Sequence, residues 1–238
     1  MLLLPGLLCD QTVWRAQAER FSRDHNVIIP DYGDADSIGD MAERALALAP
    51  GRFALAGHSM GARVAIELAR RAPQRVERLA ILDTGVHGVS EREREKRKAF
   101  LKIADEEGMD ALCDAWLPPM VHPARRHDDA FMAPLRAMVT RFTPQRFAAQ
   151  INALLNRPDA AAAVATIECP LLIGVGRQDE WSPVEQHEDI LRITGRGGFV
   201  IFEDCGHMAP CEAPEAVNDA LSAWLGGARD EERNRGQG

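Results

Sequence analysis

The pentapeptide Gly57-His58-Ser59-Met60-Gly61 follows an apolar run, 52–57, and precedes an amphipathic one, 62–71. This order predicts a strand, a sharp turn and a helix, with the serine at the apex of the turn. A serine in such a strained turn needs neighbours without side chains, so that strand and helix can approach closely. G-x-S-x-G in this context is typical of a nucleophile elbow. The alternative is a tight strand–helix turn in which Ser59 is incidental.

Composition narrows the class of protein. The chain has 238 residues, which suits one domain or one domain with an insertion. Hydrophobic residues make up 46% and charged residues 27%, as in ordinary globular proteins. The formal net charge of −8 argues against a nucleic-acid partner.

The cysteines and the amino-terminal segment indicate a cytoplasmic protein. The five cysteines are odd in number and match no zinc-ligand spacing, so we expect free thiols and no metal. Leu2-Leu3-Leu4 has no basic segment before it and is too short for a signal peptide. No apolar run is long enough to span a bilayer, and we expect no membrane association.

Apolar runs alternate with helical patterns along most of the chain, which favours a mostly parallel sheet covered by helices on both faces. The expected strands are Leu2–Leu4, Val27–Ile29, Phe53–Ala56, Leu79–Leu82, Leu171–Val175 and Gly198–Phe202. The expected helices around this sheet are Asp10–Phe21, Ser37–Ala49, 60–72, Val184–Ile193 and Pro214–Leu225.

Residues 88–166 interrupt the alternation with helical patterns and no convincing strand. We expect these residues to form a helical cap over the carboxyl ends of the strands, where ligands bind in such sheets. A stabilising subdomain without a ligand role is the alternative. Residues 1–87 and 167–226 then form the core domain, and the polar residues 227–238 a flexible tail.

A serine nucleophile needs a histidine base, and the histidine needs an acid behind it. Asp179 follows a predicted strand and is our choice for the acid, with Glu180 and Asp83 as competitors. His207 lies in the loop after Gly198–Phe202, where it can reach a site at the strand ends. The other histidines suit surface, packing or insertion positions: His25, His58, His87, His122, His127 and His187.

With the elbow, the Asp179 turn and the His207 loop in this order, the chain resembles α/β-hydrolase fold proteins with a helical cap, over residues 2–225. The resemblance implies an oxyanion hole made of two backbone N–H groups. One belongs to Met60 and the other to Leu7, with Leu8 as the alternative. Many relatives have His-Gly where this chain has Pro5-Gly6.

The resemblance to small bacterial esterases implies acyl transfer to water, without a metal or organic cofactor. We expect a small-molecule acyl substrate: an ester, a thioester or a lactone. Carbon–carbon bond hydrolysis, perhydrolase activity and a non-catalytic binding module are alternatives on the same fold. Residues that line an apolar substrate pocket, or instead pack in the core, are Leu8, Trp14, Trp116, Met120 and Trp181. The segment 156–159 also resembles capped hydrolases, which implies an Arg157–Asp159 pair near the cap hinge.

Overall fold

The computed structural model describes residues 1–235, with side chains described for residues 1–227. Five described strands form one sheet in the order β1-β2-β3-β4-β5, and all four pairings are parallel. The strands are β1 (Leu2–Leu4), β2 (Phe53–His58), β3 (Val76–Leu82), β4 (Leu171–Gly176) and β5 (Gly198–Phe202). Because the inner strands are buried on both faces, they consist of nearly continuous apolar residues.

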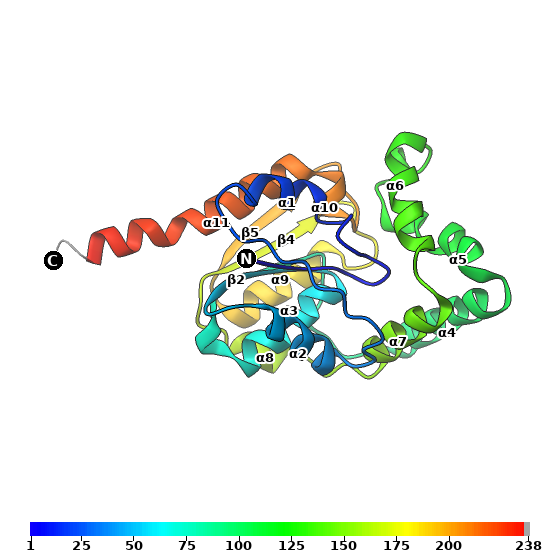
Figure 1. Cartoon of the computed structure of the whole chain (residues 1–238), viewed down its shortest axis with the longest axis horizontal. Coiled ribbons are helices and arrows are strands. Elements are labelled where there is room, and N and C mark those ends of the chain that lie inside the picture. The colour runs from blue at the N-terminus through cyan, green and yellow to red at the C-terminus, as the bar shows by residue number, and fades with distance from the viewer. Residues whose placement is uncertain (236–238) are drawn as a thin grey trace.

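Helices cover both faces of the sheet (Figure 1). One face carries α2 (Ile38–Leu48), α3 (Met60–Arg71), α8 (Ala161–Ala165) and α9 (Val184–Thr194). The other carries α1 (Arg15–Phe21), α10 (Ala209–Glu212) and α11 (Pro214–Arg235). The predicted fold class, a parallel sheet between two helical layers, is therefore confirmed.

The expected strand Val27–Ile29 is reduced to one bridge, between Leu2 and Ile28, at the β1 edge of the sheet. The Leu3 N–H donates to the Ile28 carbonyl and the Ile28 N–H donates to the Met1 carbonyl, both at 2.9 Å. Pro30 follows immediately and has no N–H to offer, so the ladder cannot continue.

Two helix boundaries also differ from the sequence analysis. α1 begins at Arg15 rather than Asp10, because residues 11–14 form turns in which the Asp10 carboxylate accepts the Thr12 N–H at 2.8 Å. α11 continues to Arg235, past the end expected at Leu225, through a stretch rich in the helix formers Ala, Arg and Glu. Residues 236–238 of the expected tail lie outside the described residues. No described helix is both long and apolar enough to cross a membrane.

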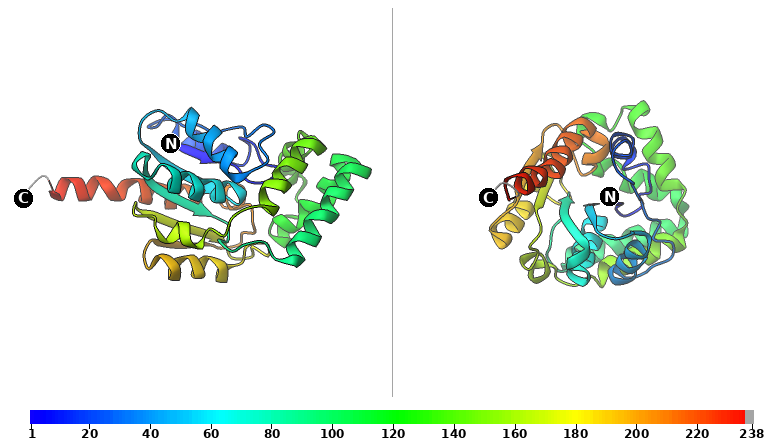
Figure 2. Two further views of the ribbon diagram at one scale, coloured as in Figure 1. Left: turned by 90° about the horizontal axis from the view of Figure 1, so that it is seen from below. Right: turned by 60° about the vertical axis from the view of Figure 1, so that its left-hand side comes forward.

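Between β3 and β4, residues 83–170 contain helices and no strand. Four of the helices stand beyond one end of the sheet, on the side opposite to the carboxyl terminus (Figures 1 and 2). These are α4 (Glu91–Glu106), α5 (Gly108–Trp116), α6 (Asp129–Thr140) and α7 (Pro144–Leu155). Short 3-10 helices occur at Pro73–Arg75, Pro118–Met120 and Pro123–Arg125. We refer to residues 88–166 as the cap.

Backbone-to-backbone packing at the elbow explains its two glycines. A Cβ atom at Gly57 would lie 2.3 Å from the Gly61 carbonyl oxygen. A Cβ atom at Gly61 would lie 2.2 Å from the Leu4 oxygen and 2.6 Å from the Pro5 oxygen. The start of α3 therefore packs directly against the end of β1, and no side chain fits between them.

We expect Gly61→Ala to lower the free energy of unfolding by about 3 kcal/mol, because the new methyl group overlaps rigid backbone atoms. Chemical denaturation followed by circular dichroism measures this change. Gly226→Ala is the matched control: its Cβ would meet no atom within 4 Å, so this variant should be neutral or slightly more stable. Equal denaturation midpoints for the two variants would contradict the packing argument.

Candidate active site

Ser59 occupies the sharp turn between β2 and α3, with φ 55° and ψ −118°. This conformation is strained for a residue other than glycine. Neighbouring hydrogen bonds hold it: the Ser59 N–H donates to the Leu82 carbonyl at 2.9 Å, and the Ala62 N–H donates to the Ser59 carbonyl at 3.0 Å. The serine is thus fixed between β3 and the first turn of α3.

The structure brings the three residues of the predicted triad together. The Ser59 hydroxyl donates to His207 Nε2 at 2.8 Å, and His207 Nδ1–H donates to Asp179 Oδ2 at 2.8 Å. The other Asp179 oxygen accepts the N–H groups of Trp181 and Ser182, each at 2.8 Å. Asp179 and His207 are both 3% exposed, so water does not compete for these bonds. The arrangement can move a proton from the serine to a histidine whose orientation the carboxylate holds.

The two competing acids face elsewhere. Asp83 is buried and its Oδ1 accepts the Gly176 N–H at 2.9 Å, while its Oδ2 lacks a hydrogen-bond partner among the described residues. Burial, and then the neighbouring charge of Asp179, raise the pKa of Asp83 well above its usual value. The Glu180 side chain is 66% exposed and lies 3.9 Å from Arg126.

Hydrogen bonds to the cap fix the loop that carries His207. The His207 N–H donates to the Met120 carbonyl at 2.9 Å. The buried Glu212 carboxylate accepts the N–H groups of Gly206 and Met208, at 3.0 and 3.2 Å, and that of His122 at 2.6 Å. Sequence reasoning missed Glu212, because a single carboxylate near a histidine does not indicate that it will accept hydrogen bonds from the loop backbone.

The backbone N–H groups expected to form the oxyanion hole differ in whether they already donate a hydrogen bond. The Leu8 N–H donates to the Gln150 side chain of α7 at 3.0 Å, so it is engaged. Leu7 lies on the same cavity as Ser59 and Met60. The Met60 N–H, at the first position of α3, has no acceptor within the helix. The geometry therefore favours Leu7 over Leu8 as the partner of Met60. Sequence reasoning also missed Gln150, which lies 142 residues from the loop it holds.

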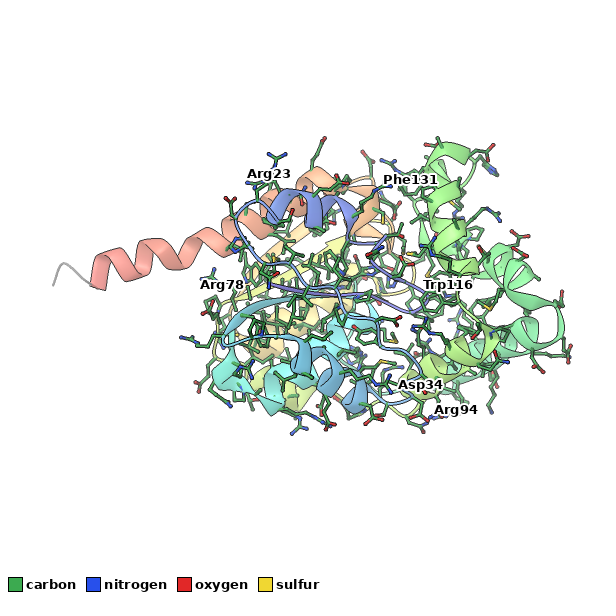
Figure 3. All side chains as sticks on the ribbon, in the orientation of Figure 1. Arg23, Asp34, Arg78, Arg94, Trp116 and Phe131 are labelled. Carbon is green, nitrogen blue, oxygen red and sulfur yellow. The ribbon has the colours of Figure 1, made fainter. Side chains whose placement is uncertain are left out.

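A cavity of about 550 Å³ opens above Ser59, lined by both core and cap. Three of the expected pocket residues line it: Trp116, Met120 and Trp181. Figure 3 shows Trp116 between the cap helices and the end of the sheet. Leu8 and Trp14 do not line this cavity, which corrects their expected role. Both are fully buried, and Trp14 packs edge-on against the His58 ring, with centroids 6.4 Å apart.

The same cavity has a charged side that the sequence analysis overlooked. Arg157 pairs with Glu93 through two hydrogen bonds of 2.7 Å, and not with Asp159 as expected. Asp159 instead accepts the Ala161 N–H at 2.8 Å, at the start of α8. The expected pair was wrong because α4 brings Glu93 to Arg157 across the cap, and Glu93 binds the guanidinium in place of Asp159.

Two buried histidines support the site in their neutral form. His58 Nε2–H donates to the His207 carbonyl at 2.7 Å, and burial lowers the pKa of His58 to about 3. His187, expected at the surface, is fully buried: its Nε2 accepts the Thr84 N–H at 2.8 Å and its Nδ1–H donates to the Pro183 carbonyl at 3.1 Å. Burial lowers the pKa of His187 to about 4. His187 thereby ties α9 to the end of β3.

The described part of the chain contains neither a cluster of metal-binding side chains nor a disulfide bond. No group of three or more His, Cys, Asp or Glu residues there could hold a metal ion. All five cysteines are unpaired thiols.

Comparison with known proteins identifies relatives along nearly the whole chain. The sequence model described as the alpha/beta hydrolase family matches residues 1–220. A thermophilic esterase from Thermogutta terrifontis is similar in structure, with TM-score 0.86, 30% identity and coverage of 94% of this chain and 88% of its own. The pimeloyl-[acyl-carrier protein] methyl ester esterase of Nitrosomonas europaea is 27% identical over 94% of each chain. The (E)-2-((N-methylformamido)methylene)succinate hydrolase of Acinetobacter baylyi is 25% identical over 94% of this chain and 89% of its own.

The neutral state of His187 predicts a pH dependence of stability. The folded protein resists protonation at His187 down to about pH 4, whereas the unfolded chain takes up this proton below about pH 6.5. The contribution of neutral His187 to the free energy of unfolding is therefore present above pH 6.5. This contribution, on the order of 3 kcal/mol, is lost as the pH falls toward 4. We expect His187→Gln to flatten the fall of unfolding free energy across this range, measured by denaturant titration at several pH values. An unchanged slope would contradict this role.

Proposed function

This chain belongs to the alpha/beta hydrolase family, and from that premise we propose that it is a serine hydrolase that cleaves a small carboxylic ester, thioester or lactone. Its relatives are named hydrolases and esterases, so it is a hydrolase. The observation that carries the finer proposal is the continuous chain of hydrogen bonds from Ser59 through His207 to Asp179. The three residues of this hydrogen-bonded chain follow the ends of three separate strands. A turn in which Ser59 has no catalytic role would not require the other two residues.

In the acylation step, Ser59 Oγ attacks the carbonyl carbon of the substrate while its proton passes to His207 Nε2. The carbonyl oxygen becomes an oxyanion, which the N–H groups of Met60 and Leu7 are placed to bind. One such donor contributes about 2.7–4 kcal/mol of transition-state stabilisation in well-studied enzymes. His207 then gives its proton to the departing alcohol, thiol or ring oxygen.

In the deacylation step, His207 takes a proton from water, and the water oxygen attacks the acyl carbon bound to Ser59. The second tetrahedral species collapses, and the proton returns from His207 to Ser59 Oγ. Asp179 stabilises the positively charged imidazole in both steps and keeps Nδ1 as the protonated nitrogen. Every proton transfer uses side chains of this chain, so the mechanism has no step for a cofactor.

The relatives support a range of acyl substrates. One is named for a methyl ester on an acyl-carrier protein and another for a methylenesuccinate compound. A small-molecule acyl substrate suits the cavity of about 550 Å³. The unpaired cysteines support the cytoplasmic location that we propose. The same site could also serve carbon–carbon bond hydrolysis, perhydrolysis or ligand binding without catalysis. The experiment described next distinguishes ester hydrolysis from these alternatives.

We expect the wild-type protein to hydrolyse p-nitrophenyl butyrate and to be labelled at Ser59 by a serine-directed phosphonate. Ser59→Ala should abolish both, because no other group supplies the nucleophile; absorbance at 400 nm and mass spectrometry of the labelled peptide measure the two results. Wild-type protein that is neither labelled nor active on esters would exclude the proposal. Faster turnover of a dienone than of the ester would favour carbon–carbon bond hydrolysis.

The two buried acids predict opposite sensitivities. Asp179→Asn should lower kcat by about 10⁴, because the amide cannot hold the correct tautomer of His207. Asp83→Asn should have a much smaller effect, since the raised pKa of Asp83 already favours its uncharged form. Steady-state kinetics on the same ester measures both. A larger loss for Asp83→Asn would transfer the role of the acid to Asp83.

A further inference from the structure

The charged side of the cavity contains three arginines and one glutamate that contact or neighbour one another. Arg97 and Arg157 both bind the Glu93 carboxylate, at 2.8 and 2.7 Å. Arg63 lies on the same cavity, and among the described residues no carboxylate lies within 4.0 Å of its guanidinium. Within this group, one negative charge stands against three positive charges. The charge of Asp159 also acts on Arg63, without an ion pair within 4.0 Å.

All three arginines are almost completely withdrawn from water. The side chains of Arg97 and Arg157 are 5% and 6% exposed, and Arg63 is 7% exposed. Uncompensated buried charge costs free energy, because protein surroundings replace hydration poorly. A cavity that keeps this excess positive charge is therefore suited to a negatively charged ligand.

Arg63 has unused hydrogen-bonding capacity and, unlike Arg97 and Arg157, no carboxylate partner within 4.0 Å among the described residues. Its Nη2 donates to the His87 carbonyl at 2.8 Å, but its Nη1 has no partner among the described residues. Burial, and then the neighbouring Arg157, lower the pKa of Arg63 to about 9, which reflects the poor solvation of its charge. The guanidinium still carries its charge at neutral pH, and it lacks an acceptor.

The position of Arg63 relates this charge to the nucleophile. Arg63 lies one helical turn after Ser59 on α3, and its N–H reaches the Ser59 carbonyl at 3.4 Å. Side chains on a helix lean toward its amino-terminal end, so the Arg63 side chain extends in the direction of Ser59. Ser59 and Arg63 line the same cavity, so one ligand can contact both side chains.

Further cations stand at the same cavity. Lys96 Nζ lies 4.1 Å from the centre of the Trp181 ring, and Arg92 lines the cavity beside it. Neither forms an ion pair with a described carboxylate within 4.0 Å, whereas Glu180 at this cavity pairs loosely with Arg126. These exposed cations attract an anion toward the cavity before the buried arginines bind it.

We propose that Arg63, backed by Arg97 and Arg157, forms a carboxylate-binding subsite beside Ser59, so that the substrate is a short ester with a free carboxylate. Monoesters of small dicarboxylic acids represent this class. The guanidinium binds the carboxylate through charge-assisted hydrogen bonds and places the ester carbonyl at Ser59. This inference rests on the proposed function, whose reaction it narrows to one class of substrate.

The test compares monomethyl with dimethyl esters of succinic, glutaric and adipic acid, with acid release followed in a pH-stat. We expect the wild-type protein to have a higher kcat/KM for at least one monomethyl ester than for its dimethyl counterpart. Arg63→Met should lower this ratio by about 10- to 100-fold, chiefly through KM, because a hydrogen-bonded charge is lost. Arg63→Lys should retain part of the preference, since it restores the charge without the planar fork.

Arg94→Met is the matched control. Arg94 is on α4 like Arg97, but it pairs with Glu91 at 3.7 Å, does not line the cavity, and lies at the edge of the molecule in Figure 3. This variant changes the net charge equally and should leave the ratio unchanged. A wild-type preference for dimethyl esters, or equal ratios for Arg63→Met and Arg94→Met, would overturn the subsite.

Binding separates failure of the subsite from failure of the proposed function. Isothermal titration calorimetry with succinate should show binding to the Ser59→Ala protein, weakened at least about tenfold when Arg63→Met is added. Without Ser59-dependent hydrolysis of any ester, the proposed function fails, and succinate binding alone decides on the subsite. Hydrolysis of neutral esters with no succinate binding would overturn the subsite and leave the proposed function in place.

Discussion

The close approach of backbone atoms at the elbow is the constraint on which the rest of the structure depends. The first turn of α3 lies against the carbonyl groups of Leu4 and Pro5, at a distance that admits only glycine at position 61. The same contact positions Ser59 beside the loop that carries Leu7. The proposed nucleophile, Ser59, and the proposed oxyanion donors therefore come from one packed junction of β1, β2 and α3, and a shift in any of the three elements would displace both.

The cap does more than cover the cavity, because its hydrogen bonds reach the catalytic loops. The Met120 carbonyl and the His122 N–H hold the loop of His207, the second through the buried Glu212 carboxylate. Gln150 from α7 holds the other side of the site by binding the Leu8 N–H. The cap thus helps to hold His207 and the loop that carries Leu7 and Leu8 in place.

Buried polar groups divide the site into a neutral support and a charged cavity. His58 and His187 are uncharged. His58 donates one hydrogen bond, and His187 accepts one and donates another. Asp83 has a raised pKa, whereas Asp179 has His207 and two backbone N–H groups as partners. The side chains facing the cavity from α3, from α4 and from Arg157 after α7 are in contrast mainly cationic. The proposed triad and the proposed carboxylate subsite therefore lie in different electrostatic environments of one site.

Local patterns predicted the fold class and the elbow, because both depend on short-range chemistry. The order of three segments along the chain predicted the group Ser59, Asp179 and His207, whose side chains the structure brings together. Glycine spacing, apolar strands and residues placed just after strand ends are visible in a single sequence. The starts of α6 and α7 depend on equally local chemistry, since the side chains of Asp128 and Thr143 cap them. The strand at Val27–Ile29 was overestimated, because sheet pairing depends on a neighbour and on Pro30. Tertiary structure alone decided which residues meet across the chain: Glu212 with the cap, Gln150 with Leu8, and Glu93 with Arg157 rather than Asp159. Such partners lie up to 142 residues apart, and their contacts depend on how helices pack, which no local pattern encodes.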